Sequence, residues 1–481
     1  MSLKRGWCSV PLAKRSVSTV LLAPRPAKVM AETDVLVVGG GPAGIGAAMG
    51  AAQAGARVLL VEQYGFLGGC ATAGLVLTLA TYHTSSNQPL TQPPELTLFP
   101  IDHGEGTPII GGVLAELVER LILAGGAIAP SPATGFMVPF DPEIFKQVTL
   151  TMLEQAGVEL LLYAFASDAL CDNTTLQGVV FETKSGPVVA KAKVIIDCTG
   201  DGDVAAYAGA PYEMGRNHDQ RVQPMTLMFL LNNFNFEPFK RYVMSHPDQW
   251  RGVCGLEVLM QRAKNQGEID IPRENILLFG GIHNSTVLLN STRILNTHGT
   301  DVWDLTHATL EGQRQIAELT QFLRRYVPGF EQTYIQQSGA MVGTRETRRI
   351  IGEYQLTTND VLQAQKFSDA IALGSYPVDI HNPQGQGTLI QKIKSSQAYE
   401  IPLRCLIPKK PENLLIAGRC ISGTHGANAS YRTIPICIAT GHAAGVCAAI
   451  AAKNNQTPRT VKATEVQKEL LKQKAYLANK T

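Results

Sequence analysis

The pattern of apolar and polar residues predicts a strand, a helix and a second strand near the N-terminus. Residues 34–38 (Asp-Val-Leu-Val-Val) form a continuous apolar run, which is typical of a strand buried on both faces of a parallel sheet. Residues 45–54 are rich in alanine and predict a helix. Residues 57–61 predict a second buried strand that ends at Glu62. Together they form a βαβ unit.

Three later segments extend this pattern. Residues 193–198 form another buried strand, and the alternating segments between 158 and 191 predict a small β-meander before it. Residues 412–422 predict a strand followed by a loop, and the loop continues to Pro435. Residues 435–452 then predict a helix whose small residues recur at helical spacing and allow close packing on the sheet.

The middle of the chain has a different pattern. Residues 211–404 lack the alternation of strand and helix. Within them, residues 222–229 predict a strand entering a catalytic cap, and residues 254–266 and 304–326 predict helices. Because 481 residues exceed one compact core, we expect two or three domains.

The first βα turn carries chemistry as well as structure. It reads G-x-G-x-x-G, from Gly39 through Gly41 to Gly44, and the acid Glu62 follows 23 residues after the first glycine. Gly39 allows the tight turn, Gly41 lets the backbone approach a pyrophosphate, and Gly44 lets helix pack on strand. The helix N-terminus adds amides and a partial positive charge, so this segment predicts a dinucleotide site.

Composition excludes several other classes of site. The net charge is +2 with no long basic face, which argues against a nucleic-acid partner. No apolar run reaches the ~18–20 residues of a membrane span, and the small-residue stretch after Ile434 suits a buried helix better. Nine cysteines occur without a single CxxC, so we expect no zinc site and no cysteine-bound iron–sulfur cluster.

The first 31 residues differ from the rest. They hold six basic residues, and no acid occurs before Glu32. Three interpretations stay open: an extension without function upstream of a start at Met30, a transit-type presequence, or a weak secretory signal. We expect a cytoplasmic protein, with organellar or secretory targeting left open by this extension.

Two further motifs narrow the dinucleotide to a flavin. Gly68-Gly69 follows the second strand, and Thr199-Gly200-Asp201 follows the strand at 193–198. Acids at 201 and 203 would repel a pyrophosphate, so this second loop is not a second dinucleotide loop. With Gly418-Arg419 near the C-terminus, these motifs resemble the FAD-dependent oxidoreductases of the glutathione-reductase-like superfamily, on the fumarate-reductase side. The resemblance covers roughly residues 33–450.

The resemblance implies an α/β fold: a three-layer, Rossmann-like FAD-binding domain of parallel sheet and β-meander, with an inserted α+β cap. We therefore expect an extension at 1–31, a discontinuous FAD domain at 32–210 and 405–455, a substrate or cap domain at 211–404, and a C-terminal helical tail at 456–481.

The resemblance also implies the cofactor and its contacts. FAD is expected to be non-covalent, because no histidine that could carry it lies between Gly65 and Tyr82. The final helix would point its N-terminus at the flavin ring and stabilise the negative charge of reduction. The expected cofactor-binding residues are Gly39, Gly41, Pro42, Ala43, Gly44, Glu62, Gln63, Gly68, Gly69, Cys70, Ala71, Thr72, Thr199, Gly200, Asp201, Gly418, Arg419, Ser430, Thr433 and Ile434.

Four residues are candidates for catalysis. His381 or His425 would handle a proton, since a histidine titrates near neutrality. Arg432 would add to charge stabilisation. Arg345 would steady a flavin or substrate carbonyl, or form an ion pair with Glu346 or Glu353. Asp379 is a weaker partner for His381, on the ground that neighbouring strand residues point to opposite faces.

The expected function is hydride transfer between a small organic substrate and flavin N5, with oxygen or a carrier as electron acceptor. Three alternatives stay open: an NAD(P)H-dependent flavin reductase, a non-catalytic flavin-binding protein, and an iron–sulfur electron-transfer subunit. Composition names no substrate class, and homodimerisation is left open.

Overall fold

The computed structural model describes residues 19–21, 23–86, 96–100, 105–394 and 396–478. Most of the predicted N-terminal extension lies outside these residues. The last residues of the extension, 28–31, are described and belong to strand β1 (Lys28–Val38). This strand pairs with β8 (Gly186–Asp197) from Lys28 on. Met30 therefore lies inside a paired strand rather than ahead of the first one.

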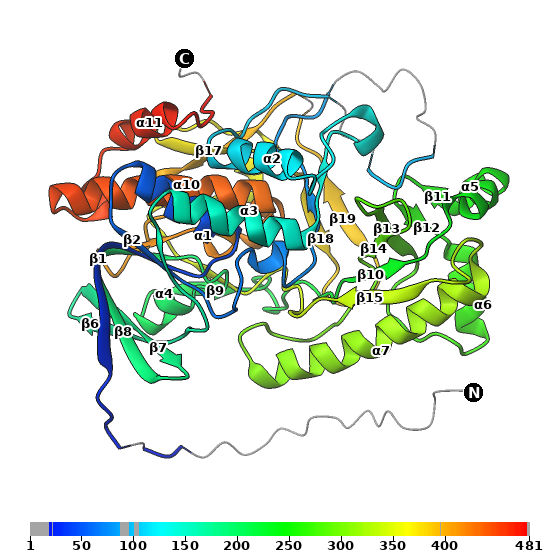
Figure 1. The fold of residues 1–481 in the computed structure, drawn as a ribbon, viewed down its shortest axis with the longest axis horizontal. Helices are drawn as coiled ribbons and strands as arrows, with labels where there is room; N and C mark the ends of the chain where they lie inside the picture. The colour runs from blue at the N-terminus through cyan, green and yellow to red at the C-terminus, as the bar shows by residue number, and fades with distance from the viewer. Residues whose placement is uncertain (1–18, 22, 87–95, 101–104, 395, 479–481) are drawn as a thin grey trace.

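Seven strands of the described chain form the larger sheet (Figure 1). Their order is β5, β2, β1, β8, β7, β6, with β21 beside β8. Strand β1 is parallel to β2, β8 is parallel to β1 and β21, and β6, β7 and β8 are antiparallel neighbours. The remaining bounds are β2 (Val58–Val61), β5 (Glu159–Leu161), β6 (Phe165–Asp172), β7 (Thr175–Thr183) and β21 (Leu414–Ile416).

Strand β8 is long enough to pair with an antiparallel strand along its first half and with a parallel strand at its end. Its first half pairs with β7 in the predicted β-meander, and its last residues, Ile195–Asp197, pair with β21. The strand therefore carries the chain from the meander into the parallel sheet. All four of β1, β2, β8 and β21 end at the same edge, which is where ligands bind in open α/β sheets.

Two helices pack closely over this sheet. Helix α1 (Pro42–Gln53) lies against α10 (Ile434–Asn454), and α10 also contacts β1 and β8. A Cβ added at Gly441 would lie 2.0 Å from the carbonyl oxygen of Ala43, and one at Gly445 would lie 2.0 Å from that of Ala47. The small residues predicted to pack on the sheet therefore serve the α1–α10 contact first.

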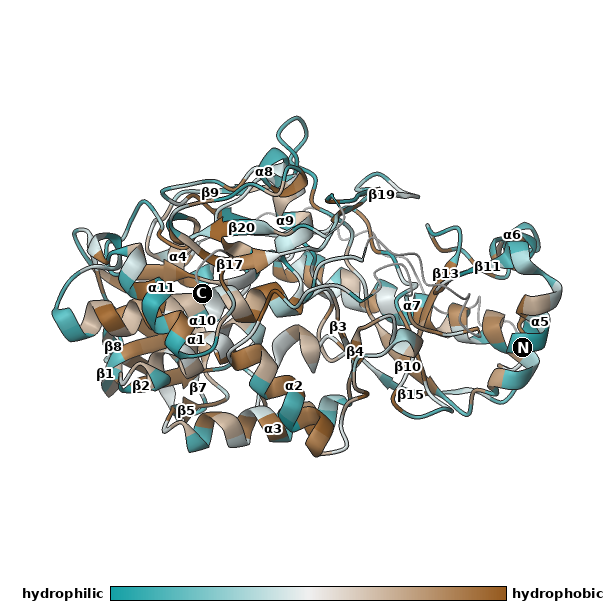
Figure 2. Cartoon of the chain, turned by 90° about the horizontal axis from the view of Figure 1, so that it is seen from above, coloured by the Kyte–Doolittle hydropathy of each residue, from teal (hydrophilic) through white to brown (hydrophobic). Residues whose placement is uncertain are grey.

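Helix α10 is the one described helix long and apolar enough to cross a membrane, and 89% of its most apolar window is buried inside the protein. Figure 2 shows it in the middle of one lobe, in contact with α1. Helices α2 (Val113–Leu123), α3 (Pro142–Gln155) and α11 (Ala463–Lys472) lie around this pair. The length and apolarity of α10 thus match its place in the core.

The second lobe is a cap built on an antiparallel sheet, in the order β11, β12, β13, β14, β10, β15. Near β10, alternate residues join different cores: Leu227, Phe229 and Leu231 join the cap core, whereas Met228 and Leu230 join the core around the larger sheet. The period of two therefore places this sheet between the two cores. Its strands are β10 (Phe229–Asn232), β11 (Trp250–Arg251), β12 (Cys254–Gly255), β13 (Ile276–Gly280), β14 (Val287–Leu289) and β15 (Tyr334–Ser338).

Three helices complete the cap: α5 (Phe236–Ser245), α6 (Glu257–Asn265) and α7 (Val302–Tyr326). The helix predicted at 304–326 is α7. The one predicted at 254–266 is α6, which begins later because Cys254 and Gly255 pair in β12. The strand predicted at 222–229 is shorter and later, because residues 225 and 226 make only isolated bridges before β10 begins. The cap core ends at Val342, and the buried apolar residues from Ile350 to Ile407 belong to the core around the larger sheet.

This last segment forms small paired strands beside the sheet edge. Strand β18 (Val378–His381) pairs with β19 (Thr388–Gln391), β17 (Ala370–Gly374) with β20 (Tyr399–Pro402), and β9 (Tyr212–Met214) with β16 (Arg348–Ile350). Helix α9 (His425–Tyr431) contacts β18 and α8 (Thr358–Leu362).

Helix α9 corrects the prediction of a continuous loop up to Pro435. The Thr424 hydroxyl caps its N-terminus by accepting from the amide of Ala427. Seven residues with four small side chains are too short for a periodic pattern, so the sequence alone did not indicate a helix here.

Candidate functional site

The predicted glycine loop lies at the carboxyl end of β1, and its three glycines have three different surroundings. Gly39 has φ +101°, and an added Cβ would lie 2.5 Å from the carbonyl oxygen of Cys198. At Gly44 the same atom would lie 1.8 Å from the Gly39 carbonyl oxygen. At Gly41 it would meet only the Cα of Gly69, at 3.8 Å. The turn and the helix packing therefore explain Gly39 and Gly44, whereas Gly41 leaves open space where a ligand can approach.

The second glycine pair packs against the first loop. The Gly68 amide donates to the Gly40 carbonyl at 2.9 Å, and Gly68 and Gly69 have positive φ angles of 111° and 49°. Of the predicted contacts here, Ala71 is buried, and the Thr72 hydroxyl donates to the Leu67 carbonyl within its own loop. The two loops together form a backbone cradle.

Cys70 lies in this cradle as a protonated thiol. Burial raises its pKa to about 11, although the charge of Arg419 lowers it. A thiol that stays protonated is a poor nucleophile.

Glu62 follows the last residue of β2, and its carboxylate faces the glycine loop. It accepts from the Gly40 amide at 2.6 Å and from the Tyr64 amide at 2.9 Å. Burial raises its pKa, while these amides lower it. The neighbouring Gln63 is exposed, and Pro42 and Ala43 are buried in the first turn of α1.

The loop after β8 brings its acids to arginines. The buried carboxylate of Asp197 accepts from the amide and hydroxyl of Thr199 and shapes the turn. Asp201 accepts from Arg419 at 2.8 Å, and Arg348 pairs with Asp203 at 2.8 Å. These ion pairs offset the negative charge that argued against a phosphate near Gly200.

The C-terminal segment brings Gly418, Arg419 and the start of α10 to the same edge. Gly418 has φ +85°, and an added Cβ would lie 2.8 Å from that of Ala43. Thr433 is the N-cap of α10 and Ile434 its first residue. The Ser430 hydroxyl instead donates to the Tyr376 carbonyl and contacts the Tyr399 hydroxyl at 2.8 Å, which joins α9 to the strands beside it.

An FAD molecule fits these residues. Two buried polar atoms at this edge have no hydrogen-bond partner among the described residues: Arg419 Nη1 and Thr433 Oγ1. Together with the open face of Gly41 and the N-terminus of α10, they offer unused donors along the predicted path of the cofactor.

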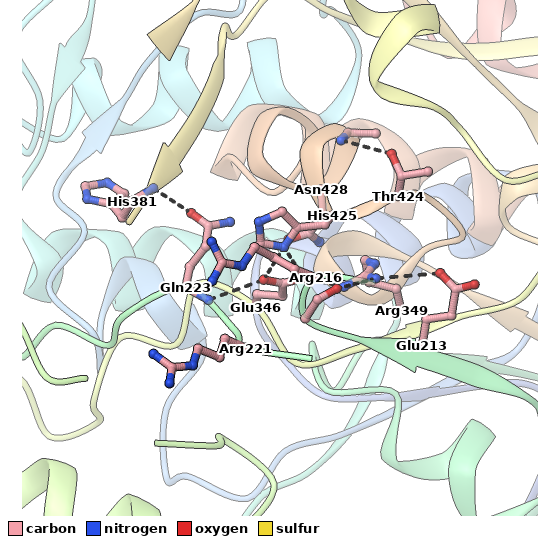
Figure 3. A network of polar contacts seen from close by, with 12 residues as sticks. Glu213, Arg216, Arg221, Gln223, Glu346, Arg349, His381, Thr424, His425 and Asn428 are labelled. Carbon is pink, nitrogen blue, oxygen red and sulfur yellow. Dashed lines mark hydrogen bonds and ion pairs between the residues drawn. The ribbon is translucent and has the colours of Figure 1, made fainter. Parts of the chain in front are cut away.

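His425 is held in one orientation by a buried ion pair (Figure 3). Its Nδ1 lies 2.9 Å from Glu346 Oε1, and Glu346 also pairs with Arg349. Glu346 is 0% exposed and Arg349 is 1% exposed. Because a carboxylate only accepts, Nδ1 carries the hydrogen. In the neutral ring the lone pair is then on Nε2, which is buried and has no partner among the described residues.

His381 is held at both ring nitrogens. Its Nδ1 lies 3.3 Å from Arg293 Nη2, so it accepts, and its Nε2 lies 3.5 Å from Asp379. Burial lowers its pKa to about 3, with the charge of Arg345 acting in the same direction. The prediction that Asp379 and His381 diverge was wrong, because residues two apart on β18 share one face.

The two histidines are linked through Gln223, a residue that sequence reasoning missed. Its backbone amide donates to Glu346 at 3.3 Å. Its side-chain oxygen accepts from the backbone amide of His381 at 3.2 Å. Arg432 donates to the same oxygen at 3.4 Å and to the Asp379 carbonyl at 3.1 Å. Figure 3 shows Gln223 between the two rings.

Arg345 does not form the ion pair that was one of its two predicted roles. It donates to the Pro224 carbonyl and to the Thr226 hydroxyl, each at 2.6 Å. Glu346 is occupied by Arg349 and His425, and Glu353 pairs with Arg459. No local pattern in the sequence would have indicated that Glu346 belongs to His425, 79 residues away.

Metal ligands are not grouped in the part of the chain that the structure describes: no three His, Cys, Asp or Glu side chains there are placed to share an ion.

The chain was compared with known families and proteins. A profile of the family described as FAD dependent oxidoreductase matches residues 34–470. Thiamine thiazole synthase of Aeropyrum pernix is 29% identical over 204 residues, which are 40% of this chain and 63% of that protein. Digeranylgeranylglycerophospholipid reductase 2 of Methanopyrus kandleri is 28% identical over 173 residues, 35% of this chain and 38% of that protein. The match thus spans less than two thirds of either relative.

Solved structures also resemble the chain at low identity. A geranylgeranyl bacteriochlorophyll reductase-like protein from Thermoplasma acidophilum has a TM-score of 0.45 and 14% identity, over 93% of this chain and 84% of that one. The myxobacterial chondrochloren halogenase has a TM-score of 0.42 and 14% identity, over 91% of this chain and 78% of that one.

Proposed function

Because this chain belongs to the family of FAD-dependent oxidoreductases, we propose that it transfers a hydride between a small organic substrate and FAD, with His425 handling the substrate proton. Bound FAD supplies the hydride acceptor or donor, at N5 of its ring. The protein binds the cofactor, orients the substrate, excludes water and moves one proton.

The residues that would hold FAD lie at the carboxyl edge of the larger sheet. The glycine loops from Gly39 to Gly44 and at Gly68-Gly69 would cradle the pyrophosphate, and Glu62 would reach the adenosine ribose. Arg419 and the N-terminus of α10 would face the flavin end, where a helix N-terminus favours negative charge. This assignment is supported by the open face of Gly41 and the unused donor of Arg419.

The observation that carries the proton-handling role is the state of the His425 ring. Glu346 fixes Nδ1 as a donor, so in the neutral ring Nε2 is the acceptor, on the side of the ring away from the carboxylate. A base oriented by a carboxylate in this way is the arrangement that general acid–base catalysis requires. Glu346 acts through the histidine and is a positioning residue.

His381 is less suited to this role. Arg293 occupies one ring nitrogen and Asp379 lies beside the other, so neither is free to take a substrate proton. Its pKa, lowered by burial to about 3, keeps the ring neutral at physiological pH. We assign it to holding β18 and Arg293 in place.

The first test is spectroscopic. The purified protein should be yellow, and a metabolite library screened anaerobically should bleach the flavin band with the true substrate. Bleaching by NADPH alone would favour the flavin-reductase alternative. Bound flavin that stays inert toward every substrate and acceptor would favour a non-catalytic flavin-binding protein.

The second test compares the same substitution at the two histidines. His425→Asn keeps a donor for Glu346 but removes Nε2, so flavin reduction by the substrate should slow about 10²–10⁴-fold. His381→Asn should slow it by less than about tenfold. The reverse ranking, with flavin content unchanged in both variants, would make His381 the proton-handling residue.

A further inference from the structure

Four arginines meet beside β18, on the substrate side of the proposed centre. Arg432 bonds to β18 at Asp379 and Arg293 bonds to it at His381. Arg345 donates to Pro224 and Thr226, and Arg432 donates to the neighbouring Gln223. Arg273 lies close enough to Arg293 for the two charges to interact. Arg273 and Arg293 are 6% and 3% exposed, respectively.

These guanidinium groups bond mainly to neutral acceptors. Arg293 donates to the carbonyls of Gly385 and Gly387, at 2.6 and 3.2 Å. Arg273 donates to the Asn275 carbonyl at 3.2 Å. In the described chain, neither of them, nor Arg345, has a carboxylate within 4.0 Å, and Arg432 has one only at 3.9 Å, in Asp379.

Other buried or half-buried arginines of this protein are paired differently. Arg419 contacts Asp201 at 2.8 Å, Arg348 contacts Asp203 at 2.8 Å, and Arg349 contacts Glu346. Where the fold buries a guanidinium for its own stability, it therefore supplies a carboxylate in contact. The arginines beside β18 depart from that rule.

The charges beside β18 are only partly balanced. Asp379 and Glu274 are the carboxylates that act on the four arginines. Burial lowers the pKa of Arg345 to about 9, with the charge of Arg432 acting in the same direction. Burial likewise lowers the pKa of Arg273 to about 10, with Arg293 contributing.

Unused donors lie among these charges. Arg273 Nη1, Arg432 Nε and Gln223 Nε2 are buried and have no partner among the described residues. A buried donor left without an acceptor costs free energy, and a guanidinium fork matches the oxygens of an oxyanion in a bidentate manner.

We propose that the substrate carries an oxyanion, a carboxylate or a phosphate, which Arg345, Arg293 and Arg432 bind beside His425. This inference rests on the proposed function and adds the substrate class to it. The anion balances the excess positive charge of these arginines, and the unused donors of Arg432, Arg273 and Gln223 are available to bond it. His381 stays neutral and accepts from Arg293, so it orients that guanidinium without adding charge.

The test measures binding to the holoprotein through the shift of the flavin absorption band, at constant ionic strength. Matched probes differ only in charge: lactate against lactamide, succinate against succinamide, benzoate against benzamide, and glycerol phosphate against glycerol. We expect the anion of at least one pair to bind tenfold or more tightly than its neutral partner. The carboxylate and phosphate arms show which oxyanion the site takes.

Arg345→Gln should weaken that binding about tenfold or more and leave the flavin content unchanged. Arg314→Gln is the matched control, because Arg314 is half-buried but fully paired with Glu311 and Glu318 on α7. If Arg345→Gln does not fold, Arg293→Gln makes the same comparison. Equal binding of anion and neutral partner, no binding of any probe, or unchanged binding in the arginine variant would overturn the inference.

The proposed function is judged separately. His425→Asn should bind the anion but lose reduction of the flavin. A neutral substrate that bleaches the flavin would leave the proposed function standing and overturn this inference. An anion that binds while no substrate bleaches the flavin would support this inference and contradict the proposed function.

Discussion

Gly41→Ala separates the cofactor site from the fold, because the added methyl group meets no protein atom closer than van der Waals contact. Gly41 has φ −73°, which an alanine adopts freely, and its added Cβ would lie 3.8 Å from the nearest atom, the Cα of Gly69. The methyl group would instead occupy the space where we place the FAD pyrophosphate. The substitution should therefore spare the protein and harm the cofactor.

The magnitudes follow from these contacts. Without a clash, stability of the apoprotein should change by no more than about 1 kcal/mol. A pyrophosphate displaced by a methyl group loses one or more charge-assisted hydrogen bonds, each worth about 1.5–3 kcal/mol. The affinity for FAD should thus fall about 10- to 100-fold.

The assay is titration of apoprotein with FAD, followed by flavin fluorescence, together with thermal unfolding of the same samples. Gly44→Ala is the control, because its Cβ would lie 1.8 Å from the Gly39 carbonyl oxygen and should lower stability and affinity together. If Gly41→Ala binds FAD as tightly as the natural chain, the cofactor does not approach this glycine and the reasoning fails.

Four further predictions follow from the structure. His381 has a folded pKa of about 3 against about 6.5 when unfolded, so the unfolded state binds the extra proton as pH falls, and stability should drop by about 2 kcal/mol between pH 6.5 and 5. His381→Asn should abolish that part of the loss in urea unfolding; the same loss in the variant would contradict the assignment. Glu346→Gln removes the carboxylate in contact with buried Arg349 and leaves it only Glu213 at 3.6 Å, so it should cost about 3–5 kcal/mol, most of it restored by adding Arg349→Met. Denaturant melts that show no restoration would place the cost elsewhere. Gly445→Ala should lower stability by about 1–3 kcal/mol because its Cβ would meet the carbonyl oxygen of Ala47, and an unchanged melting temperature would refute the tight α1–α10 contact. Finally, acid or heat should release all FAD into the supernatant, and flavin that stays with the precipitated chain would disprove non-covalent binding.

The cofactor half of the protein could be predicted because its determinants are local in sequence. A buried parallel strand appears as an apolar run, a tight turn as glycine, and a close helix contact as small residues at helical spacing. The sequence motif assigns Gly39 to a tight turn and Gly44 to a close helix contact, and the structure gives each glycine those surroundings. The β-meander and the final helix followed from the same kind of pattern.

Short elements carried too little pattern to be assigned. Helix α9 has seven residues, and the alternation at 222–229 did not indicate where regular pairing begins. The face shared by Asp379 and His381 was misjudged, although their spacing of two residues contains the answer.

The chemistry of the substrate side was decided by tertiary structure alone. His425 and His381 were equal candidates in the sequence, and they differ because Glu346 leaves one ring nitrogen of His425 free while Arg293 and Asp379 flank both of those of His381. Arg273 and Arg293 were not singled out, since an isolated arginine in a sequence carries no sign of what lies beside it. Charge balance depends on distances between side chains that are far apart along the chain. Hydrophobic periodicity determines the elements and the cofactor turn, whereas only packing decides which charges meet and which polar atoms are left for a ligand.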